Sequence, residues 1–485
     1  MTRAYSEERH DADPVFTITR RRFLRVAGAG SLMAGLAGTG LLAACGDDES
    51  SDSNASASES TSASGSASDG TSASDSSIDS IGLDEPIEIT FWHIQATLYG
   101  EAVKDIVASF NEDNPYNITV REVFQGDYGA LNQKLRAALQ GGGLPDVSMA
   151  YESDTLEYMK ADVVVPLDDY IASEEYGLTD AEIDDISPGV LARQRIPAYE
   201  GKTMSWPHGN SSQGMYYNID ILSQAGIDTP AETWEQFLEQ GRRLKSTSDV
   251  PLLASGSGPG GLLQNIMRSH GVEPLTDDGT TSNYDAPEVV AALELIKQMF
   301  DEGIAYTAED TEQEFTNGRA AIEIGTTART SSKIELIEDK FQWGITLTPQ
   351  GTAEEPITAL YGGNQVMFDK DDARRHLASW LFLRYFASSE GQAIYAARTG
   401  YFPATLSAKD TELLKENYQQ YPQKQQAFEE VFPHARIYQP SAAGNSINQV
   451  VSDQTTAVIL GRTTPAEAAA EMKREADRLL TELAS

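Results

Sequence analysis

The stretch Ile87-Glu88-Ile89-Thr90-Phe91-Trp92 alternates apolar and polar side chains and is rich in β-branched and aromatic residues. This pattern predicts a half-buried strand. Apolar residues then recur at the i, i+3, i+4 and i+7 spacing of one helix face, at Val103, Ile106, Val107 and Phe110. Asn114-Pro115 ends the predicted helix. The folded body therefore opens with a strand and an amphipathic helix.

The same order continues to residue 150. Residues 118–124 predict a second strand, the apolar spacing over residues 131–139 predicts a second helix that stops at Gly141-Gly142-Gly143, and residues 146–150 predict a third strand. Strands and helices that alternate with short links imply parallel strand pairing. The sequence therefore predicts an α/β lobe with a doubly wound, mainly parallel sheet.

A second lobe of the same class is predicted further along the chain. Thr233-Trp234-Glu235-Gln236 matches a capping box that opens a helix, and Thr464-Pro465-Ala466-Glu467 caps a long C-terminal helix. Pro287 begins another helix, whose inward stripe is predicted at Val290, Leu293, Ile296 and Phe300. No repeat at solenoid periods is present.

Composition and charge exclude several functions. The chain has 485 residues and 40% hydrophobic residues, which is enough for two or three domains with sizeable cores. Its formal net charge of −38 repels phosphodiester backbones, so we expect no nucleic-acid partner. Cys45 is the single cysteine, which excludes a disulfide framework, a cysteine-rich zinc site and an iron-sulfur centre.

The N-terminal segment has the pattern of an export signal. Thr19-Arg20-Arg21-Arg22-Phe23-Leu24-Arg25 precedes 19 uncharged residues with five glycines, and these end in Leu42-Ala43-Ala44-Cys45. The order resembles a twin-arginine signal closed by a bacterial lipobox. The alternative is a plain transmembrane anchor, which the glycines disfavour. We expect residues 1–44 to be removed and Cys45 to carry the lipid that anchors the protein to the outer face of the cytoplasmic membrane.

Residues 46–85 predict a flexible tether. They carry ten acidic residues and no Lys or Arg, and residues 50–80 contain 15 serines. Such a segment buries too little apolar surface to offset its ordering entropy. Together with lipidated Cys45 it is expected to form a disordered linker over residues 45–85. Residues 1–44 carry six arginines and four acids, so residues 86–485 still have a net charge of −30, for which surface solubility is the simpler explanation.

Six short motifs spread over residues 87–485 resemble the extracellular solute-binding proteins of carbohydrate ABC transporters. They are Phe91-Trp92-His93, Phe110-Asn111-Glu112-Asp113-Asn114-Pro115, Leu144-Pro145-Asp146-Val147, Ser205-Trp206-Pro207 with Met215-Tyr216-Tyr217-Asn218, Thr233-Trp234-Glu235-Gln236-Phe237, and Arg398-Thr399-Gly400-Tyr401-Phe402-Pro403. The resemblance implies the two-lobed periplasmic-binding-protein fold of type II, with a ligand cleft between the lobes. It places residues 86–205 and 362–405 in lobe 1, and residues 206–361 and 406–485 in lobe 2.

Within that family the likeness is strongest to members that bind sn-glycerol 3-phosphate. It implies that the cleft is lined by Tyr128, Glu152, Ser212, Gly363 and Tyr401. Two motifs differ. Ser257-Gly258-Pro259-Gly260 replaces a paired-tryptophan loop, and Ser441-Ala442-Ala443-Gly444-Asn445 replaces a segment with a phosphate-binding arginine. The loss of that arginine argues against glycerol 3-phosphate itself, although Arg329 or Arg436 could reach the cleft in its place.

The retained residues suit a sugar or polyol. A carboxylate accepts two hydroxyl hydrogen bonds, and aromatic rings cover the C–H surfaces of a pyranose. Each further candidate also has a structural explanation: Trp92 could pack in the core, the histidines could orient neighbours, and Asp154 could be a solvated surface acid. These candidates are Trp92, His93, Gln95, Asp154, Trp206, His208, Tyr361 and Asn364.

Other chemistries are weaker. Residues 256–261 match G-x-G-x-x-G before a predicted helix, but Pro259 removes a backbone donor, so a dinucleotide site is disfavoured. The same loop could offer N–H groups to an anionic part of a ligand, which keeps a glycerophosphodiester open, or could simply accommodate a bulkier sugar. An exported glycosidase would need a carboxylate pair, for which no local signature exists. An adhesive lipoprotein is the remaining alternative.

The sequence therefore predicts the substrate-binding lipoprotein of an ABC importer. It would capture a sugar or polyol by hinge closure and deliver it to a membrane permease with a cytoplasmic ATPase. We expect a monomer with no catalytic residue, no metal and no cofactor.

Overall fold

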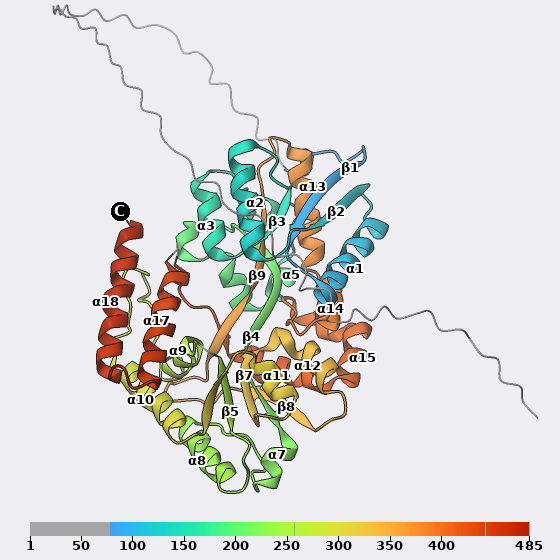
Figure 1. Ribbon diagram of the computed structural model, residues 1–485. Helices are drawn as coiled ribbons and strands as arrows, with labels where there is room; N and C mark the ends of the chain where they lie inside the picture. The colour runs from blue at the N-terminus through green and yellow to red at the C-terminus, as the bar shows by residue number, and fades with distance from the viewer. Residues whose placement is uncertain (1–77, 257, 442, 485) are drawn as a thin grey trace, which may run out of the picture. The chain divides into compact units, whose positions relative to one another are not determined.

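The computed structural model describes residues 78–256, 258–441 and 443–484. The predicted signal peptide, Cys45 and most of the predicted linker lie outside the described residues. In the described part ten strands form one sheet of order β2-β1-β3-β9-β4-β7-β5-β6, with β10 beside β9 and β8 beside β4 (Figure 1). The strands are β1 (Ile87–His93), β2 (Ile118–Phe124), β3 (Val147–Ala150), β4 (Trp206–Asn218), β5 (Leu253–Gly256), β6 (Ala305–Ala308), β7 (Ile322–Thr326), β8 (Trp343–Leu347), β9 (Thr358–Met367) and β10 (Ala435–Arg436).

The first α/β unit confirms the sequence prediction. β1 pairs in parallel with β2 and with β3, and helices α1 and α2 connect them. Asn114 joins the end of α1 to β2, because its Nδ2 donates to the carbonyl oxygens of Phe110 at 2.7 Å and Ile118 at 2.9 Å. The helices of this half are α1 (Thr97–Asp113), α2 (Tyr128–Gly141), α3 (Glu152–Lys160), α4 (Asp168–Ile171), α5 (Asp180–Asp184) and α6 (Pro188–Arg193).

The second unit is also α/β, with β5 parallel to both β6 and β7. Thr233 caps α8 through the predicted capping box, and Thr464 caps α18 by the same exchange with Glu467. The helices after β4 are α7 (Ile219–Gln224), α8 (Trp234–Lys245), α9 (Gly260–Ser269), α10 (Pro287–Asp301), α11 (Thr311–Thr316), α12 (Thr330–Ile337), α13 (Ala373–Phe386), α14 (Ser389–Arg398), α15 (Glu412–Gln420), α16 (Pro422–Gln426), α17 (Gly444–Ile459) and α18 (Pro465–Ala484).

One predicted helix face is corrected. α10 begins at Pro287 as expected, but its buried residues are Val289, Ala292, Leu293, Ile296 and Met299, while Val290 and Phe300 are only half-buried. Both sets satisfy helical spacing, and small Ala292 carries too weak an apolar signal to decide between them from the sequence. The packing of α10 against α9, α17 and α18 makes the choice.

Two long antiparallel strands, β4 and β9, run through the middle of the sheet (Figure 1). β4 pairs with β9 from Trp206 to Ser212 and then with β7 and β8 from Gln213 to Asn218. A register shift between Pro207 and Gly209 bends this pair. Gly362 has a φ of +137°, and a Cβ atom there would lie 1.8 Å from the carbonyl oxygen of Gly209. This crossing of the strands therefore requires glycine.

The described residues pack into two hydrophobic cores. The first draws mainly on residues 83–216 and 360–435, together with Phe315, Ile337, Trp343 and Ile345. The second draws on residues 215–322 and 443–480. Because β4 contributes Tyr216 to one core and Met215 to the other, it belongs to both. The lobe boundaries given above stay a prediction.

Within the described ranges no helix combines the length and the apolar character that crossing a membrane requires.

Candidate functional site

A cavity of about 1560 Å³ is the candidate ligand site. Its walls come from the starts of α1, α2 and α3 on one side, and from the start of α9, the turn after β7 and the residues around the start of α17 on the other. The lining is rich in tyrosine, with Tyr99, Tyr128, Tyr151, Tyr284, Tyr361, Tyr401 and Tyr438. Phenol rings combine an apolar face with a hydroxyl that can donate or accept.

Two of these tyrosines form a stacked pair. The rings of Tyr128 and Tyr151 lie 4.1 Å apart at 29°, and Tyr151 keeps 40% of its surface exposed. Burial raises the pKa of both phenols above the usual value, so both are neutral at physiological pH. Tyr128 also lies against Gly363, where a Cβ atom would approach the phenol oxygen to 2.6 Å. Tyr151 therefore offers an aromatic face that is supported from behind.

A charged network lies on the same wall. Glu152, the first residue of α3, pairs with Arg193 at 2.6 Å, and its Oε1 also accepts from Asn364 at 3.1 Å. Only 3% of the Arg193 side chain is exposed. Its Nη2 donates to the carbonyl oxygen of Gly362 at 2.5 Å, and its Nη1 donates to that of Tyr361 at 3.3 Å. The carboxylate and guanidinium therefore hold α3, α6 and β9 together.

The cavity collects some of the sequence-predicted residues and not others. Those in its lining are Tyr128, Glu152, Asp154, Tyr361 and Tyr401. Asp154 caps α3, because its carboxylate accepts from the Tyr151 amide at 3.0 Å and from Asn132 at 2.9 Å. Burial raises the pKa of Asp154.

The other predicted residues are not part of the lining. Ser212 is buried and donates to the carbonyl oxygen of Ala359 at 2.7 Å. Asn364 is buried between Arg193 and Glu152, and Gly363 lies under Tyr128. Trp92 is half-buried and packs against the first core. Ser212, Gly363 and Asn364 therefore lie next to lining residues, whereas Trp92 packs against the first core.

The two predicted histidines, Gln95 and Trp206 are buried and are also not part of the lining. His93 contacts Glu122 at 2.7 Å, and burial lowers its pKa. His208 stacks on Phe386 at 4.7 Å, and burial lowers its pKa to about 3, so its ring is neutral. Gln95 lies beside His208 at 3.4 Å. Trp206 is buried with its ring 5.3 Å from that of Trp380. These residues pack in the interior.

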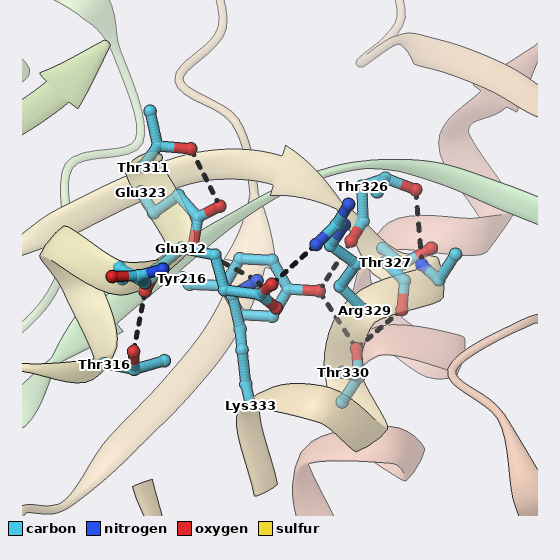
Figure 2. Close-up of polar contacts among 12 residues, drawn as sticks. Tyr216, Thr311, Glu312, Thr316, Glu323, Thr326, Thr327, Arg329, Thr330 and Lys333 are labelled. Carbon is cyan, nitrogen blue, oxygen red and sulfur yellow. Dashed lines mark hydrogen bonds and ion pairs between the residues drawn. The ribbon is translucent and has the colours of Figure 1, made fainter. Parts of the chain in front are cut away.

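The glycine-rich loop and one of the two suggested arginines reach the cavity. Gly258, Gly260 and Gly261 line it at the start of α9. Arg329 also lines it, whereas Arg436 is outside the lining and donates to the carbonyl oxygen of Pro433 at 2.7 Å. Figure 2 shows Arg329 beside Glu312, with Lys333, Glu323 and Tyr216 around this pair.

Most of the lining was not predicted from the sequence, and three of the residues that were missed make notable contacts. Arg193 has no distinguishing local pattern, because its partners on β9 lie 168 to 171 positions away. Tyr99 joins the two walls, since its hydroxyl donates to the carbonyl oxygen of Ala328 at 3.0 Å. Tyr438 has 41% of its surface exposed and meets Tyr361 edge to face at 6.2 Å. For Tyr99 and Tyr438 the only signal in the sequence is that they are tyrosines without a predicted structural role.

Comparisons with known proteins agree with this geometry. A family profile described as bacterial extracellular solute-binding protein matches residues 105–426. The sn-glycerol-3-phosphate-binding periplasmic protein UgpB of Pectobacterium atrosepticum is 25% identical over 408 residues, which cover 80% of this chain and 90% of that protein.

Solved structures share the two-lobed fold. The cyclic α-maltosyl-1,6-maltose binding protein of Arthrobacter globiformis superposes with a TM-score of 0.71 at 20% identity, over 82% of this chain and all of that one. UgpB of Mycobacterium tuberculosis in complex with glycerophosphocholine gives 0.70 at 20% identity, over 83% of this chain and all of that one.

The profile match covers well over half of the chain, and the fold and the cavity have the arrangement that such a receptor needs. Members of this family are binding proteins of transporters and work outside the cytoplasmic membrane. The chain belongs to the bacterial extracellular solute-binding proteins.

Proposed function

We propose that this protein captures a sugar or polyol in the tyrosine-lined cavity and delivers it to an ABC permease. The observation that carries the proposal is the pairing of exposed ring faces with neutral phenol hydroxyls in one cavity of about 1560 Å³. Rings cover the C–H faces of a sugar, and hydroxyls exchange hydrogen bonds with its hydroxyls. The cavity exceeds the roughly 300–1,000 Å³ of ordinary ligand pockets, which leaves room for an oligosaccharide or for closure over a smaller ligand.

Hinge closure is the proposed capture mechanism. β4 and β9 are the crossing strands. Bending at their register shift between Pro207 and Gly209 breaks the fewest backbone hydrogen bonds, because the ladder is already interrupted there. A ligand that contacts Tyr151 on one wall and Tyr438 on the other favours the closed form by its differential affinity for that form. The closed form is then the state that the permease recognises.

Export and anchoring belong to the same proposal. The twin-arginine pattern and Cys45 support a lipid-anchored protein whose linker over residues 45–85 lets a monomeric receptor reach a neighbouring permease. In a bacterial host, Cys45→Ser is expected to move the protein from the membrane fraction to the medium or periplasm. Membrane retention of this variant would contradict the anchor.

A glycerophosphodiester is the second candidate ligand. Two observations favour it: the structural neighbour from Mycobacterium tuberculosis was solved with glycerophosphocholine, and the start of α9 faces the cavity with three glycines. An exported glycosidase finds no comparable support, because Glu152 is tied to Arg193 and Asp154 caps a helix.

Thermal unfolding against a ligand panel tests the proposal. The chain from residue 46 onward is mixed with mono-, di- and oligosaccharides, polyols and glycerophosphodiesters. A ligand at 100 times its dissociation constant should stabilise the fold by about 2.7 kcal/mol and raise the midpoint by a few degrees. Unchanged ligand after incubation separates binding from catalysis. If none of these ligands stabilises the fold, the proposal is overturned.

A further inference from the structure

We propose that the cavity contains a subsite for one oxyanion group of the ligand, formed by the guanidinium of Arg329 together with the first turn of α9. The inference rests on the proposed function, since the subsite lies in the same cavity. It adds the requirement that the ligand carries a negative charge. The ligand would then be a sugar or polyol that carries a phosphate or carboxylate group.

The topology brings the parts of this subsite together. β7, β5 and β6 are adjacent parallel strands, and ligands of α/β sheets bind beyond the carboxyl ends of such strands. α9 follows β5, the 3₁₀ turn Thr327–Arg329 follows β7, and Glu312 on α11 follows β6. Three neighbouring strands therefore deliver a helix N-terminus, an arginine and its counter-ion to one edge of the sheet.

Arg329 presents unused donors to the cavity. Its side chain is 58% exposed, and its Nη1 binds Glu312 Oε2 at 2.6 Å. No described residue accepts a hydrogen bond from its Nε or Nη2. These two atoms form the edge of the guanidinium that binds a carboxylate or phosphate in a bidentate manner.

A buried charge network fixes the position of Arg329 (Figure 2). Glu312 is shared, because its Oε1 lies 3.3 Å from Nζ of Lys333, which is completely buried. The same Nζ lies 3.1 Å from Glu323 Oε2 and 4.2 Å from the centre of the Tyr216 ring. Glu312 therefore orients Arg329 through Nη1 and leaves its Nε and Nη2 without a described partner.

The start of α9 lies beside the same strand. Gln213 of β4 pairs in register with Thr326, the residue that caps the Arg329 turn. Gln213 also accepts from Asn265 of α9, and a Cβ atom at Gly261 would lie 4.0 Å from its Nε2. Gly260 and Gly261 are the first two residues of α9, and the backbone N–H groups in the first turn of a helix lack intrahelical acceptors and are suited to an anion.

No other cation among the described lining residues can take this role. Arg193 is the only other arginine or lysine there, and its guanidinium is committed to Glu152, Asn364 and backbone carbonyls. Glu335, on the second turn of α12, also lines the cavity and adds one negative charge. The subsite therefore suits a single anionic group rather than a polyanion.

Calorimetric titration of matched ligand pairs tests the subsite. The neutral probes are glycerol and glucose, and the charged probes are sn-glycerol 3-phosphate, glycerophosphocholine, glucose 6-phosphate and glucuronate. For the wild-type chain we expect a charged member to bind at least tenfold more tightly than its neutral parent, with an affinity that falls as NaCl rises. The phosphate and carboxylate arms identify which oxyanion is preferred.

The Arg329→Gln variant should lose 10- to 100-fold in affinity for the charged ligand and change less than twofold for a neutral one. Arg329→Lys should recover part of the loss. Arg319→Gln is the matched control, because Arg319 also pairs with a glutamate at 2.6 Å but lies outside the cavity lining. Unchanged melting temperatures confirm that the variants fold.

Two failures are distinguishable. If neutral sugars or polyols bind as tightly as their charged derivatives, or if Arg329→Gln binds the charged ligand normally, the subsite is overturned and the proposed function stands. If no neutral or charged member of either panel binds, the proposed function and the subsite both fall.

Discussion

Glu152 and Arg193 form an ion pair of 2.6 Å, and the same guanidinium binds two carbonyl oxygens of crossing strand β9. The pair therefore connects the wall of the cavity to β9, the strand that the proposed hinge closure would bend. A residue that the family resemblance implies as a ligand contact therefore also helps to hold β9 in place. A ligand contact at Glu152, as the resemblance implies, would be coupled to the position of β9 through the side chain of Arg193.

Glu152→Gln should destabilise the fold. The substitution leaves Arg193, which is 3% exposed, without its counter-charge, and breaking a buried pair from one side costs about 3 kcal/mol. Glu157→Gln in the same helix is the control, because the Glu157 pair with Arg136 is exposed and should contribute less than about 1 kcal/mol. Urea denaturation of both variants measures the difference. Equal losses would show that the Glu152 pair has no special role in stability.

Lys333→Met should destabilise the fold more at pH 8 than at pH 5. Burial already raises the pKa of Glu323, so the folded chain holds that proton more tightly than the unfolded chain. The stability that the proton on Glu323 contributes is present at low pH and is lost as the pH rises through the pKa of Glu323 in the folded chain. Removing Lys333 extends this loss to higher pH. Urea denaturation of the variant at pH 5 and pH 8 measures the two losses in the free energy of unfolding. Lys340→Met is the control, because Lys340 is exposed. A loss that is the same at both pH values would contradict the prediction.

Gly362→Ala should cost more than about 3 kcal/mol. The new Cβ atom would overlap the carbonyl oxygen of Gly209, and the φ of +137° is unfavourable for any residue with a side chain. Gly141→Ala is the control, since a Cβ atom there meets nothing within 4 Å at the end of α2. Thermal melting of the two variants gives the comparison. A Gly362→Ala protein as stable as the control would mean that the crossing can relax.

Tyr151→Ala should weaken binding of a sugar about 3- to 10-fold, because its exposed ring supplies an aromatic face to the cavity. The melting temperature should change little, since the ring is 40% exposed. Tyr306→Ala is the matched control, because Tyr306 lies outside the lining. Titration with the best sugar of the panel decides the matter. If Tyr151→Ala binds the sugar with normal affinity, the sugar binds at another part of the cavity.

Local patterns predicted β1, α1, β2, α2 and β3. In each of these elements the buried apolar residues recur with the period of a strand or a helix within one short stretch of sequence. β4 is different. Its segment is mostly polar and glycine, and it is a strand because β9, β7 and β8 pair with it from distant parts of the chain. Only the family resemblance marked it as a crossing.

The site divides in the same way. Tyr128, Glu152 and Tyr401 were available from the resemblance, and they line the cavity. Arg193 could not be predicted, since Arg195 two positions later is half exposed and no local feature separates them. Burial of a charged group depends on partners from other elements, and the sequence does not encode that pairing locally.

The position of β9 between β3 and β4 has a consequence for synthesis in the cell. The ribosome releases β1 to β4 first, but the strand that fills the gap between β3 and β4 follows about 140 residues later. At about 5–20 residues per second this interval lasts roughly 7–28 s. During that time the nascent chain presents two unpaired strand edges, which are natural targets for chaperones.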